Sequence, residues 1–124
     1  MIHLLEIKGR LVGLNDYISA NRTHKQLGAK MKKMESERIG WHIKQQLNSV
    51  KIENPVNIVF YWYEPNKKRD LDNISSMGRK LIQDSLVECG VLKNDGWNEI
   101  HSIKDEFYTD KDNPRVVVKL IEVV

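Results

Sequence analysis

The segment Pro55–Glu64, PVNIVFYWYE, leaves this chain the fewest options for its fold. It is rich in β-branched and aromatic residues, and Ile58, Val59 and Phe60 make both of its faces apolar. Such a pattern is expected of a strand inside a sheet, which is covered on both sides. A proline and an asparagine end the pattern. The residues that follow therefore lie just beyond a buried strand, where loops gather functional groups.

Three other segments predict strands, two predict helices and one predicts a loop. The strands are Met1–Val12, with Gly9 as a bulge or turn, Trp97–Thr109, and the almost continuously apolar Arg115–Val124. The helices run from about Lys30 to Val50 and from Ile74 to Cys89, with Gly90 as the left-handed residue after the second. Leu14–Lys30 is polar, carries Asn, Asp and Gly, and predicts a loop. This order predicts one α+β domain, residues 1–124, in which a small mixed sheet of about four strands packs with two main helices.

The first helical segment carries two apolar stripes about 100° apart. One stripe contains Met31, Met34 and Trp41, and the other contains Ile39, Ile43 and Leu47. A stripe of Met and Trp is far more often core than cofactor site. We therefore expect this helix to bury a wide face against the sheet, partly at a subunit contact.

The composition excludes disordered, membrane-spanning and disulfide-stapled classes of protein. Of the 124 residues, 40% are hydrophobic and 30% charged, as in globular domains. No apolar run approaches the roughly 20 residues of a membrane span, and the charged start is unlike a secretory signal. The single Cys89 cannot form an internal disulfide. These features predict a cytoplasmic protein with no membrane partner.

The distribution of positive charge points to a polyanionic partner. The net charge is +3 and the pI about 9.0. Five Lys or Arg residues and no acid lie between Arg22 and Lys33, a pattern typical of contact with a phosphate backbone. The alternative is a solvated face. Arg22 and Lys25 are the candidate DNA contacts in this region, while His24 is left without a role.

A second group of charges, Lys67–Asn73, comes directly after the buried strand. Three cations are followed by Asp70, Leu71, Asp72 and Asn73. If Asp70–Asp72 is extended, both carboxylates point to one side and repel each other. A divalent metal would offset the repulsion, and the basic neighbours would suit a phosphate on that metal. The alternative is that Asp72 or Asn73 only caps the following helix.

The later part of the chain adds a lysine and two acids. Lys80 and Asp84 share the polar side of the second helix, where they can pair at i, i+4. Asp95 follows in the turn Asn94-Asp95-Gly96, which is also a good turn signature without any catalytic role.

Together these motifs resemble the RusA family of phage and bacterial Holliday-junction resolvases. The matching pieces are the basic run with RDLDN, the pair Lys80–Asp84 and an Asp after a Gly-hydrophobic turn. The resemblance implies a small α+β fold and a homodimeric, Mg²⁺-dependent endonuclease that places paired nicks in four-way DNA junctions. It covers the second half of the chain closely and the first half loosely.

The resemblance also implies residue roles. Asp70, Asp72 and Asp95 match the family's acidic metal positions, Lys80 matches its functional lysine, and Lys67, Lys68 and Arg69 match its DNA-contacting run. Asn73 is a further candidate DNA contact. The segment between Asp72 and Lys80 is about a turn longer than in the best-known member. Asn94 stands where many members have the first Asp of a pair.

These roles make a workable hydrolase. Asp70 and Asp72 would bind the first metal, Asp95 would complete the cage, and Lys80 would orient water or stabilise charge on the scissile phosphate. Asp84 is left open as a partner of Lys80 or a metal contact. Three alternatives remain: a metal-dependent nuclease for flaps or other branched DNA, a non-catalytic DNA-binding phage accessory protein, and a structural module that ignores nucleic acid.

Overall fold

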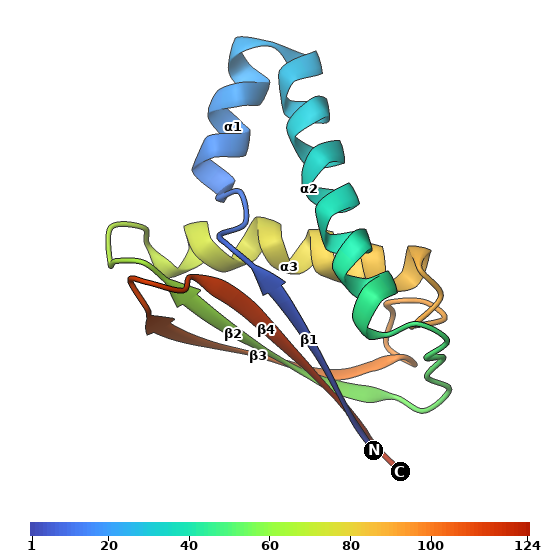
Figure 1. Cartoon of the computed structure of the whole chain (residues 1–124). Helices are drawn as coiled ribbons and strands as arrows, with labels where there is room; N and C mark the ends of the chain where they lie inside the picture. Colours follow the sequence, from blue (N-terminus) through green and yellow to red (C-terminus); the bar gives the residue numbers. More distant parts are fainter.

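The computed structural model describes all 124 residues, which form three helices and one four-stranded sheet (Figure 1). The elements in chain order are β1 (Ile2–Lys8), α1 (Leu14–Thr23), α2 (Lys25–Gln46), β2 (Val56–Glu64), α3 (Leu71–Glu88), β3 (Ile100–Thr109) and β4 (Arg115–Glu122). The α+β class is confirmed. None of the three helices is both long enough and apolar enough to span a membrane.

The sheet has the strand order β1-β4-β2-β3. The strand β4 pairs antiparallel with both β1 and β2, whereas β2 and β3 pair in parallel. The predicted mixed sheet and the interior positions of β2 and β4 are confirmed. The strands β2 and β3 are parallel, so their carboxyl ends lie at the same end of the sheet. The helix α3 follows β2 in the chain and therefore starts at that end as well.

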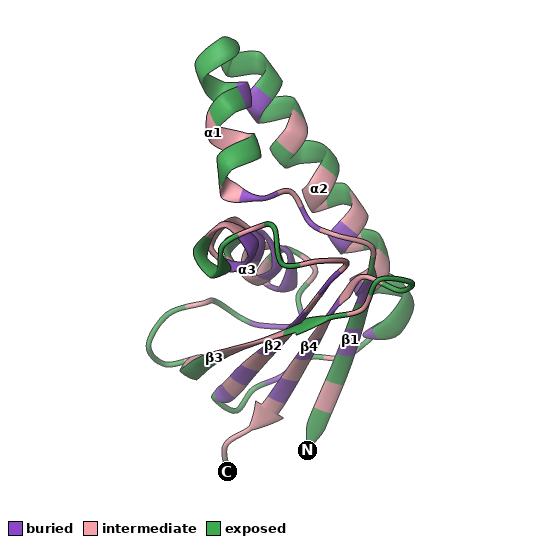
Figure 2. Cartoon of the chain, turned by 90° about the vertical axis from the view of Figure 1, so that its left-hand side faces the viewer, coloured by how far each residue is buried: buried purple, intermediate pink, exposed green.

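The core lies between one face of the sheet and the helices, which Figure 2 shows on the same side of it. Alternate residues of β2 from Val56 to Glu64 are buried, as the period of a strand requires. At the centre, α3 crosses the sheet where Gly78 lies over Trp62. A Cβ at position 78 would come within 2.7 Å of the indole ring.

The predicted loop at Leu14–Lys30 was wrong, because this segment is helical except at His24. The helices α1 and α2 form a hairpin that projects from the rest of the molecule (Figure 1). The residues that indicated a loop instead allow the helices to approach closely. A Cβ at Gly28 would lie 2.8 Å from Oδ1 of Asn21.

The burial of α2 follows only one of its two stripes. Ile39, Ile43 and Leu47 are buried as expected. Met34 and Trp41 are each 60% exposed, so the prediction that their stripe belongs to the core was wrong. The helix packs one face on its neighbours and leaves the other in solvent.

The helix α3 begins three residues earlier than the sequence pattern predicted. Asp70 is its N-cap residue, so Asp72 and Asn73 already belong to the first helical turn. The extended arrangement assumed for Asp70–Asp72 is therefore wrong. The end of the helix agrees with the prediction, since Gly90 has a φ of +79°.

Candidate functional site

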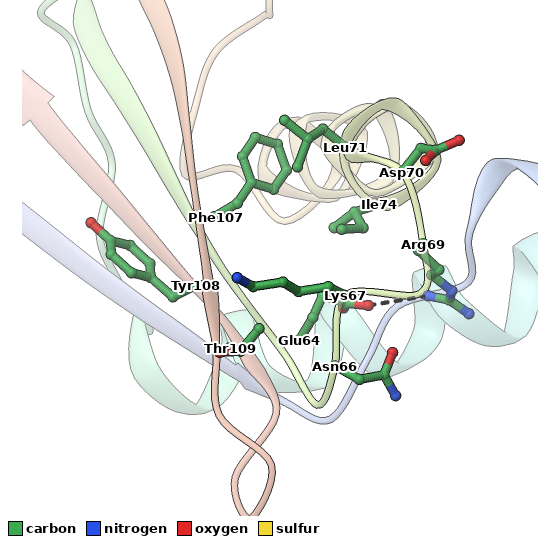
Figure 3. A pocket seen from close by; sticks show the side chains of 10 residues that line it. All are labelled: Glu64, Asn66, Lys67, Arg69, Asp70, Leu71, Ile74, Phe107, Tyr108 and Thr109. Carbon is green, nitrogen blue, oxygen red and sulfur yellow. Dashed lines mark ion pairs between the residues drawn. The ribbon is translucent and has the colours of Figure 1, made fainter.

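The candidate site lies at the carboxyl ends of the parallel strands β2 and β3, beside the first turn of α3. A cavity of about 550 Å³ opens there (Figure 3). Its lining residues come from the end of β2, the loop after it, the start of α3 and the end of β3: Glu64, Asn66, Lys67, Arg69, Asp70, Leu71, Ile74, Phe107, Tyr108 and Thr109. Open α/β sheets bind ligands in this crevice.

Asp70 lines this cavity and Asp72 lies in the adjoining first turn of α3, and the fold itself uses neither carboxylate. Asp70 occupies the N-cap position of α3, yet its side chain makes no capping hydrogen bond. Both residues are exposed, and neither carboxylate forms an ion pair. The capping alternative for Asp72 and Asn73 is excluded for α3. Both carboxylates are free to bind a cation.

The three cations of the loop divide into two kinds. Lys67 and Lys68 are exposed, and their ammonium groups form no ion pair. Arg69 instead points into the protein. Its guanidinium donates to the carbonyl of Leu11 at 3.0 Å and to Oδ2 of Asp16 at 2.9 Å. Arg69 therefore fastens the loop to the start of α1, while the side chains of the two lysines remain without a protein partner.

Asn73 acts on a different helix from the one that contains it. Its Oδ1 accepts a hydrogen bond from the backbone N–H of Asn15 at 2.8 Å. That N–H is one of the free donors at the start of α1, so Asn73 caps α1 from α3. The contact of Asn73 with DNA stays a prediction. The side-chain NH₂ is the group that would make it, because Oδ1 is bound to Asn15.

Lys80 lies with two acids farther along α3. Its Nζ is 3.0 Å from Oδ1 of Asp84 and 3.9 Å from Oδ2 of Asp95. The hydrogen bond to Asp84, the charge of Asp84 and the charge of Asp95 raise the pKa of Lys80 above 10.5. Asp95 follows Asn94, whose side chain accepts from the Asp95 N–H at 2.9 Å. Here both acids share one ammonium group of the protein.

Asp70, Asp72 and Asp95, the three acids expected to hold a metal, do not lie close together within one copy of the protein. Lys80, which contacts Asp95, lies eight residues beyond Asp72, or about 12 Å along the helix axis. No three His, Cys, Asp or Glu residues of the chain are close enough to hold an ion. A cage of Asp70, Asp72 and Asp95 therefore does not fit. Two free carboxylates do fit Mg²⁺, which is usually held by one or two carboxylates together with water and substrate phosphates.

The remaining candidates lie at the tip of the projecting hairpin. Arg22 is in the last turn of α1 and Lys25 begins α2, and both are exposed. His24, between them, caps α2 by accepting from the Gln26 N–H at 3.2 Å. The hairpin thus places free cations away from the cavity.

Sequence reasoning missed the buried ion pair at the floor of the cavity. Glu64 is 7% exposed, and its Oε1 accepts from Nη2 of Arg10 at 2.7 Å and from Nε at 3.1 Å. The guanidinium of Arg69 lies 4.0 Å from the same oxygen. The sequence did contain an indication of this pair. Glu64 lies at an even number of residues from Ile58 and Phe60, so it is on the inward-facing side of β2. An acid at an inward position needs a partner or a ligand.

The comparisons with known proteins agree with this geometry. A family model described as endodeoxyribonuclease RusA matches residues 14–121. The matched span includes every candidate site residue from Arg22 to Asp95. A search of the curated proteins finds no match.

Proposed function

The chain belongs to the RusA family of junction-resolving endodeoxyribonucleases, and we propose that it resolves four-way DNA junctions by paired, symmetrical, Mg²⁺-dependent nicks. The observation that carries the proposal is the pair of free carboxylates, Asp70 and Asp72, beside the free cations Lys67 and Lys68. A hard cation at the phosphate assists hydrolysis of a phosphodiester, and this arrangement offers ligands for the cation and charges for the phosphate.

The proposal gives the residues of the site separate roles in binding the metal and the DNA. Asp70 and Asp72 would hold Mg²⁺, which supplies an activated water and neutralises charge on the phosphate. Lys67 and Lys68 attract the DNA backbone to the cavity. An ammonium group has three donors, and Lys80 uses at most two on Asp84 and Asp95. The third N–H of Lys80 is available to a phosphate. This supports its predicted role of stabilising charge on the scissile phosphate.

A homodimer remains part of the proposal. A two-fold axis would present two Asp70–Asp72 pairs to a junction that has two-fold symmetry itself, and would account for two coordinated cuts. The proposal places the protein in the cytoplasm of a bacterial or phage-infected host cell, with roles in DNA recombination and repair.

The projecting hairpin supports contact with DNA outside the cavity. Its exposed cations would reach the backbone of a junction arm without reading sequence. Replacing Arg22 and Lys25 together by Ala should therefore weaken binding to every DNA. The slope of log K against log salt should become shallower by about 2, and a double substitution of exposed acids, Asp112 and Glu53, to Ala should not flatten it. An unchanged slope would remove the hairpin from the interface.

The proposal is tested by incubating the protein with a synthetic four-way junction and with a matched linear duplex. Each DNA is tested with Mg²⁺ and with EDTA. We expect symmetrical cleavage of the junction alone, abolished by EDTA and by Asp72→Asn. Asp112→Asn is the matched control, because it makes the same change at an exposed aspartate in the turn between β3 and β4.

Other results would identify the alternatives. Cleavage of flaps in preference to junctions would indicate a nuclease for other branched DNA. Binding without cleavage by the wild type would indicate an accessory protein. Absence of salt-dependent binding would indicate that the domain ignores nucleic acid.

A further inference from the structure

The cavity beside Asp70 has one apolar side and one charged side. Phe107 of β3 and Leu71 and Ile74 of α3 line it, and Figure 3 shows Lys67 extending from its loop toward β3 beneath the Phe107 ring. A phosphate needs the cation but gains nothing from the aromatic and aliphatic side chains. A nucleotide uses both, since its base has apolar faces and its phosphate is an anion.

The floor of the cavity carries a hydrogen-bond acceptor that the fold leaves free. Both hydrogen bonds from Arg10 end on Oε1 of Glu64, and no hydrogen bond reaches Oε2. No buried side-chain oxygen or nitrogen of the protein lacks a partner, so Oε2 must reach solvent. Glu64 is 7% exposed and lines the cavity, so the cavity is an opening toward this carboxylate.

We propose that this cavity holds one nucleobase of the junction, unstacked from the helix, with Glu64 accepting an N–H from its edge. The inference rests on the proposed function and adds a specificity pocket to it. Phe107 and Leu71 would cover the base, and Lys67 would contact the adjoining phosphate. Adenine, cytosine and guanine carry an exocyclic amino group for Glu64, whereas the one N–H on the edge of an extruded thymine lies between two carbonyl oxygens that a carboxylate repels.

The size of the cavity and the nature of the substrate both favour this occupant. At about 550 Å³ it falls within the roughly 300–1,000 Å³ of small-molecule sites. Base pairs at a branch point lack continuous stacking on one side, and an unpaired or weakly stacked base is the least expensive to extrude. Because Asp70 lines the same cavity, the captured base would fix the position of a neighbouring phosphate relative to the carboxylates.

The test first maps the cut sites on a four-way junction and then varies the nucleotides that flank the cut phosphate. Single-turnover cleavage is compared for the four bases and for an abasic nucleotide at each position. At one position we expect the abasic nucleotide and thymine to slow cleavage about tenfold. Independently of the cut sites, 2-aminopurine is placed in turn at each position beside the branch point, and at one of them it should give a fluorescence increase on binding, with or without cleavage.

Two variants separate this pocket from a general effect on the fold. In Glu64→Gln the carbonyl oxygen can still accept from Arg10 while the NH₂ faces the cavity, so the discrimination against thymine should shrink or reverse. Leu71 is 56% exposed at the mouth, so Leu71→Trp should fill the cavity and abolish the dependence on base. Leu27→Trp, a change at an exposed leucine of α2, should leave that dependence intact.

The possible failures are distinguishable. Cleavage at equal rates for all bases and for the abasic nucleotide, without a 2-aminopurine signal, would overturn the pocket and leave the nuclease proposal standing. Binding with the 2-aminopurine signal but without cleavage would support the pocket and overturn the nuclease. Absence of binding to any DNA would overturn both.

Discussion

The two ends of α3 carry the same kinds of charged residue in opposite states. At the start of the helix, Asp70 and Asp72 are exposed and have no partner in the protein. Farther along, Asp84 and Asp95 both lie within 4 Å of the Lys80 ammonium. One group of acids has a cation of the protein beside it, and the other has none.

This difference indicates where a ligand is needed. Two unit charges of the same sign repel by about 1 kcal/mol in water when they lie about 4 Å apart, and by less at greater separation. The positive end of a helix offsets only about 0.3–1 kcal/mol of that. The cations that could have neutralised Asp70 and Asp72 are used elsewhere or point outward, since Arg69 binds Leu11 and Asp16. Beyond the surrounding water, an external cation would supply the compensation that the fold does not.

The largest expected effect is therefore a difference between the same substitution at the two ends. Asp70→Asn should slow cleavage of a four-way junction about a thousandfold, because it removes a charged metal ligand. Asp84→Asn should slow it less than about tenfold, because it weakens only a pair within the protein. Single-turnover cleavage of one junction at saturating protein measures both.

Binding provides the control for this pair. Asp70→Asn should bind the junction as tightly as the wild type or more tightly, since a negative charge has left the phosphate site. Equal losses of activity at positions 70 and 84 would abolish the distinction between free and neutralised acids.

The next largest effect concerns Gly78, where α3 packs on Trp62 of the sheet between the two groups of acids. At Gly78, between them, a Cβ would lie 2.7 and 2.9 Å from two atoms of the Trp62 ring, which is 1% exposed and cannot move aside. Gly78→Ala should destabilise the protein by about 1–2 kcal/mol, because overpacking outweighs the gain in helix propensity. Urea denaturation measures the change.

The matched control for this substitution is Gly40→Ala in α2. The nearest atom to a Cβ at position 40 is Sγ of Cys89 at 3.9 Å, an ordinary contact. This variant should be up to about 1 kcal/mol more stable than the wild type. If both variants gain stability, α3 is not held against Trp62 as described, and the spacing between its two ends is not fixed by the sheet.

Local patterns in the sequence were sufficient to predict the sheet and α3 but not α1. The strands β2 and β4 are apolar on both faces, and the Gly90 turn ends α3, so short-range signals agree with the final structure there. In the hairpin the same kind of signal misled, because Asn21 and Gly28 look like turn residues and in fact allow α1 and α2 to approach. That use depends on a contact between helices, which periodicity does not reveal.

The candidate site was predicted in its residue types and only partly in its arrangement. The motif predicted metal ligands at Asp70 and Asp72, and in the structure both side chains are exposed after the buried strand β2, while their binding of a metal stays a prediction. The motif did not reveal that Asn73 caps α1 or that Arg69 binds Leu11 and Asp16. The partners of these two residues all lie more than fifty residues away in the chain. Free and occupied side chains are distinguished by tertiary contacts alone.

The smallest expected effect comes from the ion pairs of Lys80, whose side chain is 64% exposed. Asp84 and Asp95 raise the pKa of Lys80 above 10.5. A group whose pKa is higher in the folded state adds stability below its ordinary pKa and loses it as the pH rises through the folded value. The deficit of Lys80→Met in the free energy of unfolding should therefore be small and constant near neutral pH and should vanish only above pH 10.5. Denaturation of both proteins across this range measures it. A deficit that vanished already near neutral pH would mean that the ammonium is not held by Asp84 and Asp95, and the acids at both ends of α3 would then be equally free.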